Sequence, residues 1–349
     1  MPKPKFLDLN FRNDSKRSDL ECEYIKNLQG AGEYPIQFSY PLALQFELTG
    51  KCNLNCKHCY NRSGDDDVVS SDVMTPERWK QLAHQIVGDG GIFQCIISGG
   101  EPLLLGRNLY EIMDILHDDG TSFVIITNGL LLNKITAKRL SKYRFYWFQI
   151  SIDGSSAKIH DDFRGVKGSW SKAVCGAMEV SNLGIPLVIA HTVTKQNLED
   201  VENMILLAYN LGASKIMIGE VLPSGRAIFN DDVILNLDER EELYGKIANL
   251  SKKFGSKIAV ERSLDIRISL KRCMSQPNSS GIIRPNGDFR LDCMVPFTIG
   301  NVNQNSIKDI WTNKGINAWQ DPKVKDFVLS VSSAQKGCIA NHVHADIKL

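Results

Sequence analysis

The chain has 349 residues, enough for one large domain or for a domain with an extension. Its 41 basic residues balance 40 acidic ones, so no net charge favours binding to nucleic acid or to an anionic membrane surface. No apolar run is long enough to span a membrane, and the polar start does not resemble a signal peptide. With nine cysteines and no secretory signal, we expect a cytoplasmic protein whose cysteines bind metal rather than form disulfides.

The first 40 residues are mixed and polar, with a helix-like stretch near 20–28, and we treat them as an arm. From residue 41 to about 223, strand-like and helix-like segments alternate. The predicted strands are nearly continuously apolar, which is typical of a parallel sheet covered by helices. They span residues 42–49, 92–97, 123–126, 146–152, 187–193 and 215–219. The predicted helices between them span residues 75–87, 109–117, 134–141, 170–183 and 198–211.

The pattern changes in the last third of the chain. A helix is expected over 237–254, and three short strand-like segments follow at 257–260, 281–284 and 288–291. Pro285-Asn286-Gly287 predicts a hairpin turn between the last two segments, and a helix is expected near 307–312. We therefore divide the chain into an arm (1–40), an α/β unit (41–235) and a small α+β unit (236–349).

Three cysteines form a C-x3-C-x2-C cluster directly after the first predicted strand: Cys52, Cys56 and Cys59. Gly50 ends the strand, so the cysteines lie on a loop, where their soft thiolates can converge. Such a loop suits three irons of a [4Fe-4S] cluster and leaves the fourth iron open to a substrate or cofactor. A zinc site with His58 as fourth ligand is the alternative.

This spacing at the end of a first strand resembles the radical S-adenosylmethionine (SAM) enzymes. The resemblance implies that SAM chelates the open iron and is cleaved reductively to a 5′-deoxyadenosyl radical, which takes hydrogen from a substrate. It also implies a partial (β/α)6 TIM-like barrel with its chemistry at the C-terminal ends of the strands. An electron donor such as flavodoxin or ferredoxin is expected as a partner.

Two further strand ends carry residues that the resemblance assigns to SAM. The Gly-Gly-Glu-Pro sequence at 99–102 resembles a family motif, in which Gly100 and Glu101 would bind the SAM amino group. Glycine allows a ligand to approach the backbone closely. Ser151, in Ser-Ile-Asp-Gly, is placed near the SAM ribose or carboxylate by the same resemblance.

Three more SAM contacts are expected on the same basis. Arg164 occurs where related enzymes have an arginine that binds the SAM carboxylate, for which a guanidinium has the right donor geometry. A surface ion pair with Asp161 or Asp162 is the alternative for Arg164. Asn128 and Leu222 are expected to line the adenosine pocket, although a core or turn role fits each equally well.

A second set of cysteines, Cys273, Cys293 and Cys338, lies around the predicted hairpin and near the end of the chain. The hairpin, the cysteine after it, Gly300-Asn301-Val302 and Ile310-Trp311 resemble the SPASM and twitch extensions, which bind auxiliary [4Fe-4S] clusters. Three cysteines allow one auxiliary cluster at most, or none if they are structural. The fourth ligand could be Asp292, His342, His344 or the substrate.

In organisation the chain most resembles maturases of ribosomally made peptides. We therefore expect hydrogen abstraction from a peptide substrate, giving a crosslink or an epimerised residue. The alternatives are a radical SAM dehydrogenase of an aminocyclitol or sugar, and a metal-binding scaffold without turnover. The sequence does not identify the group that quenches the substrate radical. The candidates are Cys95, Cys175, Tyr60 and the auxiliary cluster.

Overall fold

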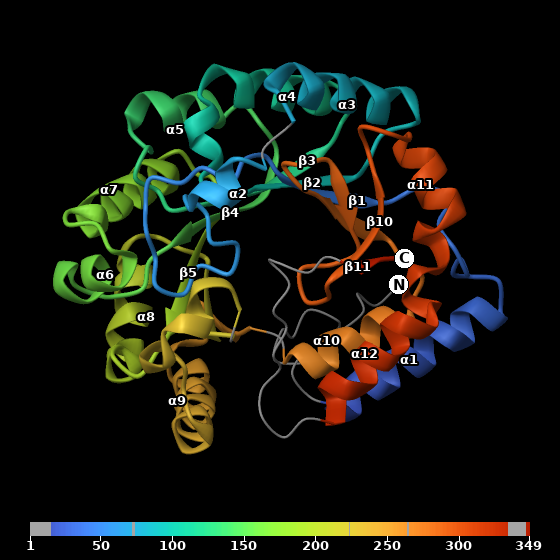
Figure 1. Ribbon diagram of the computed structural model, residues 1–349. Helices are drawn as coiled ribbons and strands as arrows, with labels where there is room; N and C mark the ends of the chain where they lie inside the picture. Colours follow the sequence, from blue (N-terminus) through green and yellow to red (C-terminus); the bar gives the residue numbers. More distant parts are fainter. Residues whose placement is uncertain (1–14, 72–73, 223, 264, 334–346) are drawn as a thin grey trace.

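The computed structural model describes residues 15–71, 74–222, 224–263, 265–333 and 347–349 (Figure 1). Its strands form a single sheet of eleven in the order β11-β10-β9-β8-β1-β2-β3-β4-β5-β6-β7. The sheet curves strongly, and helices α3 to α8 line its outer face (Figure 1). This arrangement is the α/β partial barrel that the sequence predicts.

The barrel consists of parallel strands, with each strand hydrogen-bonded to the next along the chain. Six of them confirm the predicted strands, and a seventh, β7, extends the sheet where the sequence predicts only a short strand-like segment. Their bounds are β1 (Ala43–Glu47), β2 (Gln94–Ser98), β3 (Ser122–Thr127), β4 (Phe145–Ser151), β5 (Leu187–Val193), β6 (Lys215–Glu220) and β7 (Ala259–Arg262).

The helices between these strands follow the apolar periodicity of the sequence. In α3, Thr75 caps the first turn by accepting from Arg78 N, and the buried face presents Trp79, Leu82 and Ile86 to the sheet. The expected helices are α3 (Pro76–Gly88), α4 (Arg107–Asp118), α5 (Lys134–Leu140), α7 (Ser169–Asn182) and α8 (Val201–Asn210), the last preceded by η3 (Leu198–Asp200). Three elements were not expected: α2 (Asp66–Val69), η2 (Pro102–Leu105) and α6 (Ala157–Arg164).

The predicted hairpin is present and joins the barrel sheet. Strands β8 (Ser280–Ile283) and β9 (Asp288–Arg290) are antiparallel, and Gly287 supplies the positive φ of 85° in their turn. Strand β8 also pairs in parallel with β1. The hairpin therefore lies directly beside the strand that leads into the first cysteine cluster.

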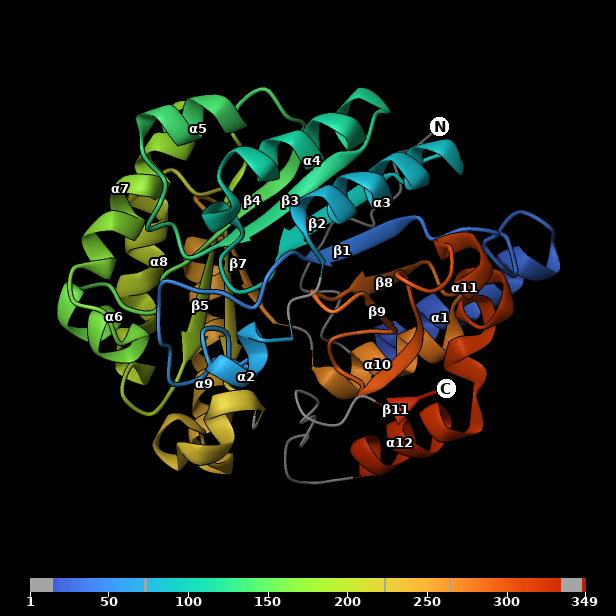
Figure 2. The same cartoon turned by 45° about the horizontal axis from the view of Figure 1, so that its top comes forward.

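The remaining elements lie either around this hairpin or near the β6–β7 end of the barrel sheet (Figure 2). They include β10 (Phe297–Asn301), which pairs with β9, and β11 (Ile347–Lys348), which pairs with β10. The expected helices are α9 (Leu237–Phe254) and α11 (Ile307–Asn313). The elements that were not predicted here are α10 (Ile266–Ser275), α12 (Pro322–Ser333), η4 (Gly225–Phe229), η5 (Asp231–Val233) and η6 (Gly315–Gln320).

The N-terminal helix α1 (Ser15–Gly30) packs on α10 rather than on the barrel (Figures 1 and 2). Cys22 Sγ lies 2.9 Å from Ser275 Oγ, and ion pairs join Asp19 to Lys271 and Glu21 to Arg272. The arm thus stabilises the part of the chain that carries the second set of cysteines.

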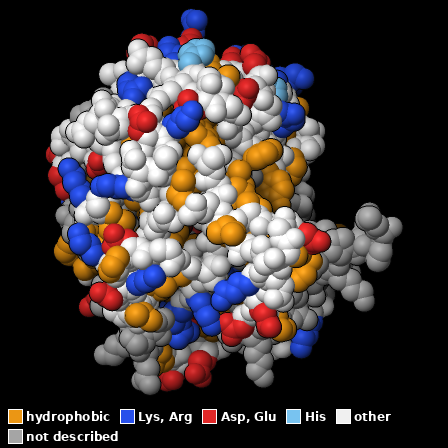
Figure 3. Space-filling view, turned by 90° about the vertical axis from the view of Figure 1, so that its right-hand side faces the viewer, with side chains coloured by type: hydrophobic (Ala, Val, Ile, Leu, Met, Phe, Trp, Pro, Cys, Tyr) orange, Lys and Arg blue, Asp and Glu red, His pale blue; other side chains and the backbone are white. Residues whose placement is uncertain are grey.

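A single cluster of buried apolar side chains runs from β1 through the barrel helices to α12, so the hairpin region shares the barrel's core. No described helix is both long and apolar enough to cross a membrane. On the face with α11, basic and acidic side chains are interspersed over the described surface (Figure 3). This mixture agrees with the balanced net charge of the sequence.

Candidate active site

The loop after β1 brings the three cysteines of the C-x3-C-x2-C cluster close together. The pKa of Cys52 is raised to about 11, mainly by burial and also by the charges of Glu101, Cys56 and Cys59, so the three thiols lie within electrostatic reach. Burial also raises the pKa of Cys56, whereas the Arg164 charge lowers it. Metal binding supplies the driving force that such buried thiols need for ionisation.

Each of the three sulfur atoms has a nitrogen donor beside it. Asn128 Nδ2 lies 3.9 Å from Cys52 Sγ, Arg164 Nη1 lies 3.6 Å from Cys56 Sγ, and the Ser63 amide lies 3.4 Å from Cys59 Sγ. Hydrogen bonds to the sulfurs are a recurrent feature of iron–sulfur sites, where they tune the cluster. The donor set therefore fits a [4Fe-4S] cluster with one cysteine on each of three irons.

The zinc alternative receives no support from the described residues. Among them, no group of three or more His, Cys, Asp or Glu side chains is arranged around a single ion. His58, the proposed fourth ligand, is stacked on Phe163 with ring centroids 4.4 Å apart. A zinc site needs four ligands converging on one point, whereas a cluster spreads its cysteines over separate irons.

The Gly-Gly-Glu-Pro segment is packed tightly against the start of the cysteine loop. The Gly100 amide donates to Thr49 O at 2.6 Å, and a Cβ on Gly100 would collide with the Lys51 carbonyl oxygen. Only glycine fits this approach.

The Glu101 side chain faces β3 and is fully buried. Its carboxylate accepts from Leu103 N at 3.0 Å, Thr127 Oγ1 at 2.7 Å and Asn128 N at 2.8 Å. Burial raises the pKa of Glu101, and these hydrogen bonds oppose the rise. Glu101 thereby joins the ends of β2 and β3. Binding of the SAM amino group by Gly100 and Glu101 remains a prediction.

Arg164, at the end of α6, is buried, and its Nε lies 2.6 Å from Asp153 Oδ2. The predicted alternative, a surface pair with Asp161 or Asp162, is not what the structure shows, because Asp161 accepts from the amides that begin α7. Burial disfavours the charged form of Asp153, but Arg164 and the neighbouring histidines together outweigh it, and the pKa of Asp153 falls to about 2. Contact of Arg164 with the SAM carboxylate remains a prediction.

The other predicted SAM residues all lie at the C-terminal ends of barrel strands. Ser151 is the last residue of β4, and Leu222 follows β6 and packs against the main core. Asn128 follows β3, and its Nδ2 donates to Asn53 Oδ1 at 2.7 Å, so this amide holds the cysteine loop. The structure thus brings Asn128 to the cysteines, while its predicted adenosine contact, like those of Ser151 and Leu222, stays a prediction.

The second set of cysteines is partly within the described residues. Cys273 lies on α10 and Cys293 follows β9. Burial raises the pKa of the Cys273 thiol, and the Asp292 charge raises it further, so Asp292 lies within electrostatic reach of Cys273 as well as next to Cys293 in the chain. Cys338, His342 and His344 lie outside the described residues. A ligand role for Asp292 stays a prediction.

A polar network that the sequence analysis missed joins the cysteine loop to the hairpin. Tyr60 Oη donates to Glu47 Oε1 at 2.8 Å, Asn61 Nδ2 lies 3.2 Å from the same oxygen, and Arg284 Nε lies 3.5 Å from Glu47 Oε2. Desolvation of its hydroxyl raises the pKa of Tyr60 well above its usual range, with contributions from the Glu47 and Cys293 charges, although 38% of the residue as a whole is exposed. Because Tyr60 directly follows Cys59 in the chain, this network lies within reach of one cysteine of each set, Cys59 and Cys293. The signal in the sequence that could have pointed to this network is Glu47, an acidic residue at the end of a largely apolar strand.

Comparison with known proteins agrees with this geometry. The model of the radical SAM superfamily matches residues 46–208, and the model of the SPASM iron–sulfur cluster-binding domain matches residues 273–336. The chain belongs to the radical SAM superfamily. This radical SAM enzyme carries a SPASM region, and its cofactors are a [4Fe-4S] cluster with SAM and an auxiliary iron–sulfur cluster.

Similar proteins of this superfamily fall into two groups. One group consists of heme synthases, such as the AdoMet-dependent heme synthase of Methanosarcina barkeri (strain Fusaro / DSM 804). It is 27% identical over 292 residues, which cover 78% of this chain and 82% of that protein. The other group modifies peptides, and includes the subtilosin biosynthesis protein AlbA of Bacillus subtilis (strain 168). AlbA is 26% identical over 299 residues, which cover 83% of this chain and 63% of AlbA.

Among solved structures, Streptococcus suis SuiB bound to S-adenosylmethionine superposes with a TM-score of 0.65 at 16% identity. The superposition covers 93% of this chain and 78% of SuiB. At this level of identity the likeness supports the fold alone.

Proposed function

We propose that this radical SAM enzyme matures a peptide by abstracting hydrogen from a side chain or Cα, which leads to a crosslink or an epimerised residue. When bound, the cluster and SAM supply a 5′-deoxyadenosyl radical for that abstraction. The observation that carries the proposal is the Tyr60–Glu47–Arg284 network, which joins the cysteine loop to the hairpin of the SPASM region. Peptide-modifying relatives such as AlbA and PqqA peptide cyclase add support.

The network suits an oxidation because a crosslink removes two electrons from the substrate, and hydrogen abstraction removes only one. A second redox site near the radical site can accept the other electron. Glu47 is 2% exposed and Tyr60 is 38% exposed, so the carboxylate is fixed inside while the tyrosine borders accessible space. We propose that Tyr60 lines the substrate site and that Glu47 orients its hydroxyl.

A second candidate is an iron-porphyrin substrate. The observation in its favour is the share of each relative that aligns with this chain, which is 82% of the heme synthase from Methanosarcina barkeri but only 63% of AlbA. For either substrate we propose a cytoplasmic enzyme that receives its electrons from a donor such as flavodoxin or ferredoxin.

The test is a mass measurement. Reconstituted enzyme, SAM and reductant are incubated anaerobically with a short peptide encoded beside the gene, and in parallel with Fe-coproporphyrin III. A peptide loss of about two mass units means oxidation or a crosslink, and a gain of about one unit only in heavy water means epimerisation. A mass change in the porphyrin alone would refute the peptide proposal and support the second candidate.

A further inference from the structure

The cysteine loop has neither helix nor strand over residues 51–65, so its backbone groups must find partners elsewhere. Many of the partners come from one distant segment, η4, which lies between β6 and β7. The residue of this segment with the most contacts to the loop is Arg226, whose side chain is 13% exposed. It lies about half the chain away from the loop in sequence.

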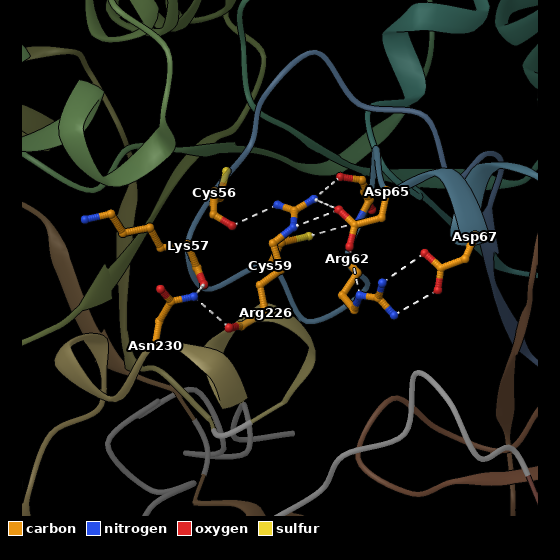
Figure 4. A network of polar contacts seen from close by, with 9 residues as sticks. Cys56, Lys57, Cys59, Arg62, Asp65, Asp67, Arg226 and Asn230 are labelled. Atoms are coloured by element: carbon orange, nitrogen blue, oxygen red, sulfur yellow. Dashed lines mark hydrogen bonds and ion pairs between the residues drawn. The ribbon is translucent and has the colours of Figure 1, made fainter.

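Arg226 contacts the loop at four places (Figure 4). Its Nη1 donates to Cys56 O at 2.9 Å, its Nη2 donates to Ser63 O, and its Nε donates to Asp65 Oδ1 at 3.1 Å. Its backbone amide donates to Cys59 O at 3.0 Å. One residue thus holds the carbonyls of two of the three cysteines.

The neighbours of Arg226 are shaped for the same contact. Gly225 has a φ of 56°, and a Cβ there would collide with the carbonyl oxygens of Cys59 and Tyr60. Asn230 Nδ2 lies 2.8 Å from Arg226 O and 3.3 Å from Lys57 O. The segment and the loop therefore pack as one unit, with the backbone of each against the other.

We infer that Arg226 is a positioning residue that holds the cysteine loop in the conformation that binds the SAM-dependent cluster. The inference rests on the proposed ligand role of Cys52, Cys56 and Cys59. A guanidinium presents five N–H donors in a rigid plane, so it can hold several acceptors at once. The backbone of each cysteine fixes its Cβ and leaves Sγ only the staggered χ1 positions, so holding the carbonyls of Cys56 and Cys59 restricts where two ligand atoms can lie.

The test compares Arg226→Gln and Arg226→Lys with the control Arg62→Gln. Arg62 belongs to the same loop, but its guanidinium binds the side chains of Asp65 and Asp67. Each variant is reconstituted anaerobically, reduced and mixed with SAM. The SAM-responsive EPR signal, which reports the cluster with an open iron rather than the auxiliary one, is then followed while a chelator removes iron.

We expect Arg226→Gln to fold with a wild-type circular dichroism spectrum but to lose the signal about tenfold faster or more, as is typical when a residue that orients metal ligands is removed. The rate of signal loss in Arg226→Lys should lie between those of the wild type and Arg226→Gln, because an ammonium keeps the charge but not the planar arrangement of donors. Arg62→Gln should match the wild type.

A wild-type rate of signal loss in Arg226→Gln would overturn the inference. If that variant does not fold, Arg226→Lys decides by the same criterion. The triple variant Cys52→Ala/Cys56→Ala/Cys59→Ala separates this inference from the proposed function. Should the triple variant keep a SAM-responsive signal, the ligand set is wrong and the inference falls with it. Should it lose the signal while Arg226→Gln behaves as wild type, the inference alone is overturned.

Discussion

Arg164 Nη1 lies 3.6 Å from the Sγ of Cys56, and both side chains are buried. The same guanidinium forms an ion pair with Asp153, whose other carboxylate oxygen accepts from Thr192 N at 2.7 Å. A single buried cation therefore joins a cysteine of the loop to the ends of β4 and β5. Because a positive charge beside a thiolate favours its ionised form, this pair contributes to ligand binding as well as to folding.

Replacing Arg164 tests the energetic side of this relationship. In Arg164→Gln the buried Asp153 carboxylate loses its partner, and we expect the free energy of unfolding to fall by about 3 kcal/mol. The double variant Asp153→Asn/Arg164→Gln should recover much of that loss, because no uncompensated charge remains. Urea denaturation measures both. The control Arg107→Gln breaks a pair in which Arg107 is 91% exposed, and should cost less than about 1 kcal/mol. An equal loss of unfolding free energy in Arg164→Gln and Arg107→Gln would contradict this account.

His160 should make stability depend on pH. Its ring is buried, its Nδ1 accepts from Asp153 N at 3.1 Å, and burial lowers its pKa from 6.5 to about 4. The unfolded chain therefore takes up the proton first, so stability is full above about pH 6.5 and is lost as the pH falls toward 4.

His160→Asn keeps an acceptor for Asp153 N but removes the titration. We expect the wild type to lose more stability than His160→Asn between about pH 7 and pH 5, measured by urea unfolding of both proteins. Parallel losses would show that His160 does not carry this dependence.

Gly100 should be intolerant of any side chain. In Gly100→Ala the added methyl meets the Lys51 carbonyl oxygen, so the strand end and the cysteine loop must separate. We expect SAM binding, measured by calorimetry on reconstituted enzyme, to weaken about tenfold or more, because misplaced supporting groups cost that much at metal sites. The matched control is Gly245→Ala in α9, where a Cβ meets nothing within 4 Å. That variant should be neutral or stabilised by about 0.5–1 kcal/mol.

Cys293 should be needed for the auxiliary cluster but not for SAM cleavage. We expect Cys293→Ala to drop from about eight irons per chain to about four and still to form 5′-deoxyadenosine. Product formation should fail, because the second electron has no acceptor. Cys175→Ala, at an exposed cysteine on α7, is the control and should keep its iron. Unchanged iron content in Cys293→Ala would show that Cys293 is not a ligand.

Local patterns predicted most of the barrel. Apolar runs located β1 to β6, and the candidate SAM residues other than Arg164 lie at or just after a strand's C-terminal end, as parallel topology requires. The turn at 285–287 predicted the hairpin, because glycine supplies its positive φ. Short elements were not predicted. Helix α2 has only four residues, and α10 presents only three buried residues, Ile266, Ser269 and Leu270.

Contacts between segments that are far apart in the chain could not be predicted from the sequence. Nothing local indicates that β8 pairs with β1, since register between distant strands depends on the whole core. Likewise, sequence placed Arg164 near SAM or on the surface, whereas the structure gives it Asp153 and Cys56 as partners. The sequence offers no signal for Arg226, because most of its acceptors are backbone carbonyls, which every residue possesses. The division at residues 40 and 235 remains a prediction.

The central claim is that Cys52, Cys56 and Cys59 hold the cluster that cleaves SAM. The most direct test measures 5′-deoxyadenosine from reconstituted wild type and from the variant with all three cysteines changed to alanine, under reducing, anaerobic conditions. We predict that the variant forms none while it keeps the iron of its auxiliary cluster. Formation of 5′-deoxyadenosine by the variant at the wild-type rate would contradict the account.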